Sequence, residues 1–317
     1  MSDDQEVKLA KAHRIINSAY SKKTNVLRYF GLSSSSAELL EKGIEMLKEI
    51  SGEYKITRKY SKYVDISIKI VDLYDKLFDT TKCNSVRKYQ AMILIDLIEH
   101  HIKHNPSICL YDLSKKYIET SRESFDEYLL TNAYNQIGNI YIESSDEKEQ
   151  SLAFECFTEL SEMSGVISQK LVYMIAKHKK NYIDAGNKYK LIGNDMITKK
   201  SGKWTMKTIL LKSILCYICG DDIVLAKQTF KYINDTNVFF SRSNESKLLR
   251  DIFNCLEKND VNKFTEIITE YDVVFQLDDH LVDLLLTIKK NLEKNTQLGE
   301  LYCDELYCDE LYCDELC

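Results

Sequence analysis

The stretch that decides the fold runs from Lys203 to Asn291 and begins KWTMKTILLKSILCYICGDDIVLAKQTFKYIND. After Thr236 to Val238 it continues FFSRSNESKLLRDIFNCLEKNDVNKFTEIITEYDVVFQLDDHLVDLLLTIKKN. Apolar residues recur three and four positions apart, as at Leu281, Leu284, Leu285 and Ile288. This spacing places them on one face of an α-helix, so the stretch predicts successive amphipathic helices.

The rest of the chain has the same character. The 317 residues include one proline and ten glycines, and 44% of them are hydrophobic. Few helix breakers and enough apolar surface for a large core predict an all-α protein. Because single amphipathic helices cannot bury their own apolar faces, we expect a tetratricopeptide-like solenoid of helical hairpins over residues 1–235, followed by a C-terminal helical bundle over 236–294.

Helix starts are marked by side chains that carry oxygen. Ser144 to Asp146, Asp221 with Asp222, and Asp278 with Asp279 each precede an apolar periodic segment. Such side chains accept hydrogen bonds from the unpaired amides of a first helical turn. We therefore expect helices to begin at these three places.

The last residues depart from the helical pattern. Residues 300–316 read ELYCD, ELYCD, ELYCD, EL, a period that matches neither a helix nor a strand. We expect residues 295–317 to form an acidic tail without regular structure. A neutral origin by slippage in the coding sequence explains the repeat as well as selection does.

Composition also bears on location. No apolar run reaches the roughly 18 residues that a membrane-spanning helix needs, and Met1 is followed by Ser-Asp-Asp-Gln-Glu and not by a basic segment with an apolar core. We expect a cytoplasmic protein whose ten cysteines are mostly reduced thiols.

Charge is distributed unevenly. The net charge of −6 comes from the end of the chain, because residues 299–317 hold seven acidic side chains and no Lys or Arg. The segment from Lys170 to Lys212 is the opposite, with eleven lysines against Asp184 and Asp195. This basic segment is a candidate docking surface for an acidic partner.

The order of residues from Lys203 to Asn291 resembles the C-terminal third of the alpha-SNAP family. The elements that carry the resemblance are the spacing K-x-x-x-K-x-x-x-x-K followed by L-C-x-x-C, and the phrases ESKLL, N-D-V-x-x-x-T-E, EYD and QLDDHLVDLLLTIKK. Weaker resemblance extends over Phe125 to Gly193 and includes Gly138-Asn139-Ile140-Tyr141. It implies an adaptor of vesicle trafficking that couples SNARE bundles to the ATPase NSF, with no catalytic residues, no cofactor and no nucleic-acid partner.

The resemblance implies which residues meet a SNARE bundle. The family holds the acidic bundle with basic side chains, and the matching positions here are Lys103, Lys170 and Lys207. Arg242 lies two residues from the position of a family arginine and is expected to substitute for it. Two further family positions for lysine are occupied by Ile102 and Asn132, so this set is smaller than in the family. For any single lysine, an ordinary solvated helix face explains the residue equally well.

The resemblance also implies contacts with NSF and with membranes. Asp221 and Glu257 match acidic family positions, whereas Asn254 and Lys258 replace acids, and the chain ends in Asp314, Glu315, Leu316 and Cys317 with leucine next to last. Near the N-terminus, apolar side chains around Gly31 occupy the position of a family loop that touches the bilayer: Leu27, Tyr29, Phe30 and Leu32. Packing against the first hairpin is the alternative for this loop. Peripheral association with membranes is the expectation.

Three other functions stay open at this stage. A tetratricopeptide-like scaffold for an unrelated partner would have the same fold, and a homologue that binds SNAREs without stimulating NSF would retain only part of the activity. Asp278, Asp279 and Asp283 are reminiscent of the magnesium-binding acids of terpenoid synthases, although helix capping explains the first two.

Packing explains the cysteine and histidine clusters more simply than a metal or redox site does. Cys216 and Cys219 lie in an apolar helical run and are expected in the core, with no metal bound. His100, His101 and His104 are expected at the end of a hairpin helix.

Overall fold

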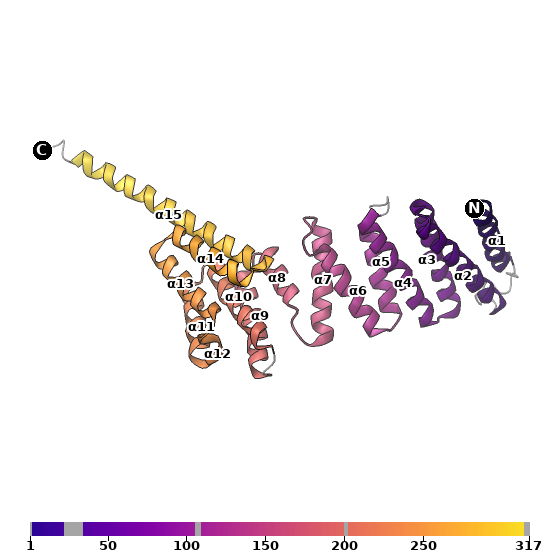
Figure 1. Cartoon of the computed structure of the whole chain (residues 1–317), viewed down its shortest axis with the longest axis horizontal. Helices are drawn as coiled ribbons and strands as arrows, with labels where there is room; N and C mark the ends of the chain where they lie inside the picture. Colours follow the sequence, from indigo (N-terminus) through magenta and orange to yellow (C-terminus); the bar gives the residue numbers. More distant parts are fainter. Residues whose placement is uncertain (1, 22–33, 105–108, 200–201, 314–317) are drawn as a thin grey trace. The chain divides into compact units, whose positions relative to one another are not determined.

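The computed structural model describes residues 2–21, 34–104, 109–199 and 202–313. These residues form fifteen α-helices and no strand, which confirms the all-α prediction (Figure 1). The chain divides into two compact units, Met1–Cys156 and Phe157–Cys317. The predicted boundary near residue 235 falls inside the second unit, and that domain division stays a prediction.

The first unit is built from helices that contact their neighbours in the chain, as expected for stacked hairpins. They are α1 (Ser2–Ser21), α2 (Ser34–Ile56), α3 (Tyr60–Thr81), α4 (Asn84–His104), α5 (Leu110–Glu123) and α6 (Glu127–Tyr141), and α7 (Glu147–Ser164) begins in this unit and ends in the second. Large side chains such as Tyr54, Tyr117 and Tyr134 are fully buried between them. The core therefore runs along the stacked helices and has no single centre.

A partly buried polar network ties three helices of this unit together. The Asp75 carboxylate on α3 accepts hydrogen bonds from Arg87 Nη1 at 2.6 Å, Gln90 Nε2 at 2.8 Å and Lys116 Nζ at 2.7 Å. Arg87 and Gln90 belong to α4, and Lys116 belongs to α5. Because donors from α4 and α5 meet the same carboxylate on α3, the network fixes how these three helices pack.

The second unit surrounds one buried helix. It contains α8 (Gln169–Lys177), α9 (Tyr182–Thr198), α10 (Lys203–Cys219), α11 (Ile223–Thr236), α12 (Val238–Ser241), α13 (Asn244–Lys258), α14 (Val261–Phe275) and α15 (Asp279–Cys313). Helix α10 contacts α9, α11, α13 and α15, and its residues are buried from Met206 to Cys219 apart from Thr208. The nearly unbroken apolar run in the sequence of α10 reflects this burial on several sides.

Two glycines let α9 approach α10 closely. A Cβ atom added at Gly186 would lie 2.6 Å from Tyr217 Cε1, and one added at Gly193 would lie 2.5 Å from Leu210 Cδ2. The two glycines are seven residues apart and so share one face of α9. Their missing side chains make room for the α10 residues that fill the core.

Three predicted helix starts are confirmed. Asp146 Oδ1 accepts from the amide of Lys148 at 2.9 Å, Asp222 Oδ1 from Leu225 at 2.8 Å, and Asp278 Oδ1 from Leu281 at 2.9 Å. Each carboxylate satisfies an amide that the first helical turn leaves unpaired. The positions of α7, α11 and α15 are thus set by local chemistry.

Helix α15 runs to Cys313, where the sequence predicts no regular structure after residue 294. The expectation relied on the five-residue period, which turns successive leucines by about 140° around a helix and gives no continuous apolar stripe. The repeat contains no glycine and no proline, and its Glu and Leu residues favour helix. Backbone propensity therefore extends the helix although the period gives it no face to bury.

The start of α15 is held by a buried histidine. His280 is 7% exposed, its Nδ1 lies 2.7 Å from Tyr189 Oη, and its ring meets Tyr173 edge-on at 4.6 Å between centroids. Burial is the main cause that lowers the pKa of His280 to about 3, and the charge of Lys212 lowers it further. Asp278 and Asp283 act in the opposite direction. The imidazole is therefore neutral in the folded protein.

Substitution of Gly186 by alanine is expected to destabilise the second unit by about 1–3 kcal/mol, because the added methyl group meets the rigid Tyr217 ring and the Ser213 carbonyl at 3.1 Å. Gly52→Ala in α2 is the matched control, since nothing lies within 4 Å of its added Cβ, and it should stabilise by roughly 0.5–1 kcal/mol. Urea unfolding followed by circular dichroism measures both changes. Equal effects of the two substitutions would contradict the close packing of α9 on α10.

Stability should fall as the pH is lowered from 6.5 toward 3, because His280 takes up a proton in this range only when the chain unfolds. At pH 5.5 the expected loss from this residue is about 1.4 kcal/mol relative to neutral pH. The measurement is the free energy of unfolding at pH 7.5 and 5.5, for the wild type and His280→Gln. The variant should lose less stability than the wild type over this interval, and an identical loss would argue against a buried neutral His280.

Candidate partner-binding surfaces

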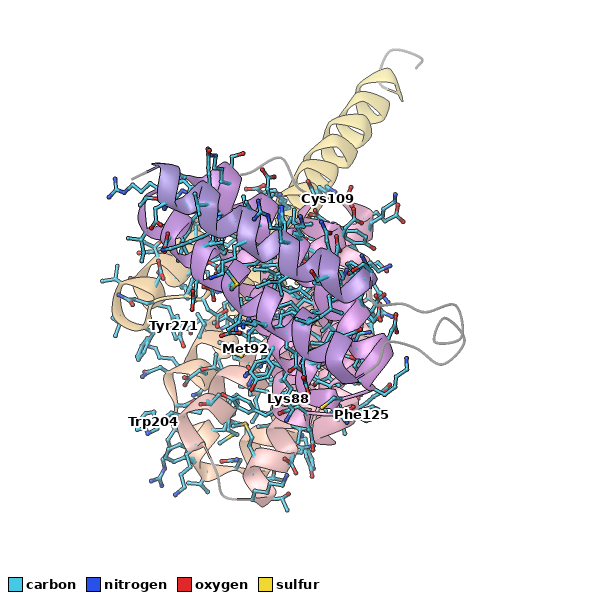
Figure 2. The ribbon with its side chains drawn as sticks, turned by 90° about the vertical axis from the view of Figure 1, so that its right-hand side faces the viewer. Lys88, Met92, Cys109, Phe125, Trp204 and Tyr271 are labelled. Carbon is cyan, nitrogen blue, oxygen red and sulfur yellow. The ribbon has the colours of Figure 1, made fainter. Side chains whose placement is uncertain are left out.

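A cationic and aromatic surface lies where the start of α10 meets α12. We call it the α10–α12 surface, and it consists of Lys203, Trp204, Lys207, Val238, Phe239 and Arg242. Asn237 Nδ2 and Met206 Sδ lie 3.8 Å apart and join the two helices beside it. Trp204 is 77% exposed and stands at the outside of its helix (Figure 2). An exposed tryptophan of this kind is typical of a contact surface.

Lys207 is enclosed by the aromatic side chains of this surface. Its Nζ lies 4.3 Å from the centroid of the Trp204 ring and 4.3 Å from that of Phe239. The residue is only 8% exposed. The positions of Trp204 and Lys207, three apart on a helix, bring the ring over the ammonium group. The ammonium group is therefore covered by two aromatic rings, with which its cation–π attraction is worth about 0.5–2 kcal/mol.

The other predicted SNARE contacts are exposed. Lys170 lies in the first turn of α8 with its Nζ 5.7 Å from the centroid of Phe157, and Arg242 is the residue that follows α12. Lys103 is exposed in the last turn of α4, in the first unit. The structure thus brings Lys207 and Arg242 to the same end of the second unit's bundle through α10 and α12. Lys170 is on a separate helix.

Much of the basic segment serves the fold. Four of its lysines pair with carboxylates at 2.7 to 3.8 Å: Lys177 with Asp283, Lys188 with Asp184, Lys199 with Asp195, and Lys212 with Asp278. Lys212 is 8% exposed and pairs with Asp278 across α10 and the start of α15. The positive charge that is available to an acidic partner therefore comes mainly from the remaining lysines, which include Lys203 and Lys207.

The two predicted acidic contacts with NSF that the structure describes both lie on the second unit. Asp221 is exposed in the turn between α10 and α11, where its φ of 61° is left-handed. Glu257 is exposed near the end of α13 and accepts a hydrogen bond from Lys227 Nζ at 2.6 Å, which lowers the pKa of its carboxyl group. Lys227 thus offsets part of the charge that Glu257 offers to a basic partner.

Two predicted contact regions lie outside the described residues. The membrane-contacting loop with Leu27, Tyr29, Phe30 and Leu32 falls within residues 22–33, and the acidic end with Asp314, Glu315 and Leu316 falls within 314–317. Among the described helices, none is both long and apolar enough to cross a bilayer.

The acids that suggest a magnesium site are engaged otherwise. Asp278 pairs with Lys212 at 2.7 Å and caps Leu281. Burial acts to raise the pKa of Asp278, but the hydrogen bond and charge of Lys212 hold it below its usual value. Asp283 pairs with Lys177 at 3.3 Å. Lysines in direct contact with two of the three carboxylates oppose a divalent cation, so the terpenoid synthase hypothesis is not supported by this geometry.

The cysteine and histidine clusters also take structural roles. Cys216 and Cys219 are buried in α10, and burial raises the pKa of both thiols, so neither is an activated nucleophile. His100 is buried near the end of α4 against Tyr60, Tyr63 and His104. No group of three His, Cys, Asp or Glu side chains suited to a metal ion occurs in the part of the chain that the structure describes.

Sequence reasoning missed Trp204 and Phe239 as members of a candidate surface. The signal was present, because Trp204 is the single tryptophan of the chain and lies between Lys203 and Lys207. Phe239 could not be found in this way, since it comes from another helix and 32 residues after Lys207. Only the packing of α12 on the start of α10 brings its ring to the lysine.

Comparison with known proteins relates the chain to one family. The family model described as soluble NSF attachment protein, SNAP, matches residues 10–293. The alpha-soluble NSF attachment protein of Homo sapiens is 22% identical over 303 residues, which are 92% of this chain and 97% of that protein. The probable vesicular-fusion protein sec17 homolog of Schizosaccharomyces pombe is 25% identical over 162 residues, about half of each chain (51%).

A plant relative and one solved structure complete the comparison. The alpha-soluble NSF attachment protein of Vitis vinifera is 27% identical over 183 residues, 58% of this chain and 60% of that protein. The crystal structure of C. therm. Get4 covers 89% of this chain and 88% of its own at 11% identity, with a TM-score of 0.23, which is too low to indicate a shared architecture. Because the family model spans nearly all of both compact units, this chain belongs to the soluble NSF attachment protein family.

Proposed function

We propose that this chain is an adaptor that binds SNARE complexes and recruits an NSF-type ATPase that disassembles them. The observation that carries the proposal is the family match over residues 10–293, which includes the helices of every described candidate contact. The printed name of the human relative, a soluble NSF attachment protein, supports the same role. The chain itself would do no chemistry, since ATP hydrolysis belongs to the ATPase.

The proposed SNARE contacts are Lys103, Lys170, Lys207 and Arg242 together with the aromatic part of the α10–α12 surface. Basic side chains steer an acidic helical bundle toward the surface, and this attraction weakens as salt screens it. Trp204 and Phe239 add apolar area at the point where Lys207 supplies charge. An aromatic anchor next to a cation is the combination that binding hot spots favour.

The proposed NSF contacts are Asp221 and Glu257, with the acidic end Asp314, Glu315 and Leu316. Exposed carboxylates suit basic grooves on a partner, and Asp221 is exposed in the short turn between α10 and α11. The loop with Leu27, Tyr29, Phe30 and Leu32 is proposed to touch the membrane surface, so that the protein works in the cytoplasm in peripheral contact with membranes.

A homologue that binds SNAREs without stimulating NSF is the second candidate. The observation in its favour is the α13 surface, where Asn254 and Lys258 are exposed beside Glu257, which itself pairs with Lys227. This surface carries less negative charge than a set of unpaired acids would. Association with NSF would then be slow and weak.

Trp204→Ala is expected to weaken binding of a SNARE complex about tenfold or more, because the exposed ring that covers Lys207 is lost. Lys207→Met, which keeps the packing and removes the charge, should weaken binding and reduce its dependence on salt. Val224→Ala, an exposed apolar residue on α11, is the control. Titration of a labelled SNARE complex at low and high ionic strength gives these affinities. Unchanged affinity for both α10 variants would remove this surface from the proposal.

Disassembly of SNARE complexes by NSF should proceed with the full-length chain and should fail, or fall by at least tenfold, when the chain is truncated after Leu298. The acidic end then no longer reaches the ATPase, while binding of the SNARE complex is retained. Release of a fluorescent SNARE fragment, with ATP and with a non-hydrolysable analogue, measures the activity. Full-length protein that binds SNAREs but supports no disassembly would establish the second candidate and contradict the first.

A further inference from the structure

A small basic cavity lies between the end of α8, the turn into α9 and the start of α15. Its volume is about 180 Å³, and the charged side chains that line it are Lys177, Lys180, Lys290 and Asp283. Three ammonium groups around one carboxylate leave a local charge of about +2 at neutral pH. Cavities for drug-sized ligands measure roughly 300–1,000 Å³, so this one fits a small anionic group.

The positive charge of the cavity is only partly neutralised. Lys177 Nζ lies 3.3 Å from Asp283 Oδ2 and 2.6 Å from Tyr173 Oη, so the single carboxylate is already engaged. Lys180 and Lys290 are exposed, and neither makes an ion pair with the described residues. These two lysines can turn toward a bound anion without breaking any existing pair.

A buried ring nitrogen beside the cavity has no hydrogen-bond partner among the described residues. His280 lines the cavity, and its Nε2 makes no hydrogen bond in the described part of the chain. Its Nδ1 lies 2.7 Å from Tyr189 Oη, closer than the 3.4 Å from that hydroxyl to the Gln169 carbonyl. Tyr189 Oη therefore contacts both Nδ1 and the Gln169 carbonyl, whereas Nε2 is the ring nitrogen that is left without a partner. An unpaired ring nitrogen of this kind offers a polar partner to a bound group, and the neighbouring lysines favour an anion over a cation.

The backbone adds to the positive potential. Tyr182, which lines the cavity, is the first residue of α9, a helix of 17 residues. The N-terminus of such a helix carries a partial positive charge that attracts anions. The cavity thus combines lysines, an unpaired imidazole nitrogen and a helix start.

We propose that this cavity binds the phosphate group of a small phosphate ester, either a soluble one or the headgroup of a lipid. A phosphate dianion matches the local charge of the site, and lysines bind phosphate as point charges. A single carboxylate carries half that charge and leaves one ammonium group uncompensated. This site shares no residue with the proposed SNARE and NSF contacts, so the two proposals are independent.

Binding of phosphate to the full-length chain tests the site. Isothermal titration with inorganic phosphate and with inositol trisphosphate, at constant ionic strength, should show saturable binding to one site. The double variant Lys180→Gln/Lys290→Gln should weaken the affinity at least tenfold. Lys294→Gln, one helical turn after Lys290 and outside the cavity, is the matched control and should bind as the wild type does.

Two further measurements define the ligand. Addition of phosphate should shift the His280 side-chain resonance in a spectrum of ¹⁵N-histidine-labelled protein, with wild-type circular dichroism in each variant as evidence of folding. Flotation with vesicles that contain phosphatidylinositol phosphate, compared with phosphatidylcholine vesicles, separates a lipid headgroup from a soluble ester. Absence of saturable binding, equal weakening by Lys294→Gln, or acetate that binds as tightly as phosphate would overturn the proposal.

Discussion

The burial of α10 is the constraint on which the second unit depends. An apolar helix that is covered on several sides needs neighbours that approach it closely, and Gly186 and Gly193 on α9 provide one such approach. The same burial requires a partner for Lys212, because an unpaired ammonium group inside a helix bundle is costly. Asp278 supplies it, and thereby fixes where α15 begins. Packing and electrostatics thus specify the same arrangement.

The exposed start of α10 contributes Lys203, Trp204 and Lys207 to the α10–α12 surface. Lys207 lies one turn inside the helix and is covered by Trp204 from its own helix and Phe239 from α12. The lysine and the two rings form one unit, because removal of either ring would expose the ammonium group and change the electrostatic potential at this surface. A partner on this surface would therefore contact the exposed aromatic rings directly, and the ammonium group of Lys207 would lie behind them. This differs from a simple row of solvated lysines.

Charge in the basic segment is divided between folding and recognition. Lys177 and Lys212 face carboxylates on α15, whereas Lys180 stays free of ion pairs at the neighbouring cavity. A sequence shows the same residue type in all three positions. Lys177 and Lys212 are paired, unlike Lys180, because α15, more than sixty residues later in the chain, packs beside α8 and α10 and brings carboxylates to them. Counting lysines consequently overestimates the charge available to a partner.

The sequence alone determined the helical fold, the helix starts at Asp146, Asp222 and Asp278, and the family resemblance, because periodicity, capping and motif order are local properties of the chain. Tertiary structure decided which charges are available and which side chains share a surface. Phe239 beside Lys207, Asp278 beside Lys212 and His280 beside Tyr189 all join residues more than thirty positions apart. Such contacts depend on how helices pack, and helix packing is set by the whole core and by no single segment.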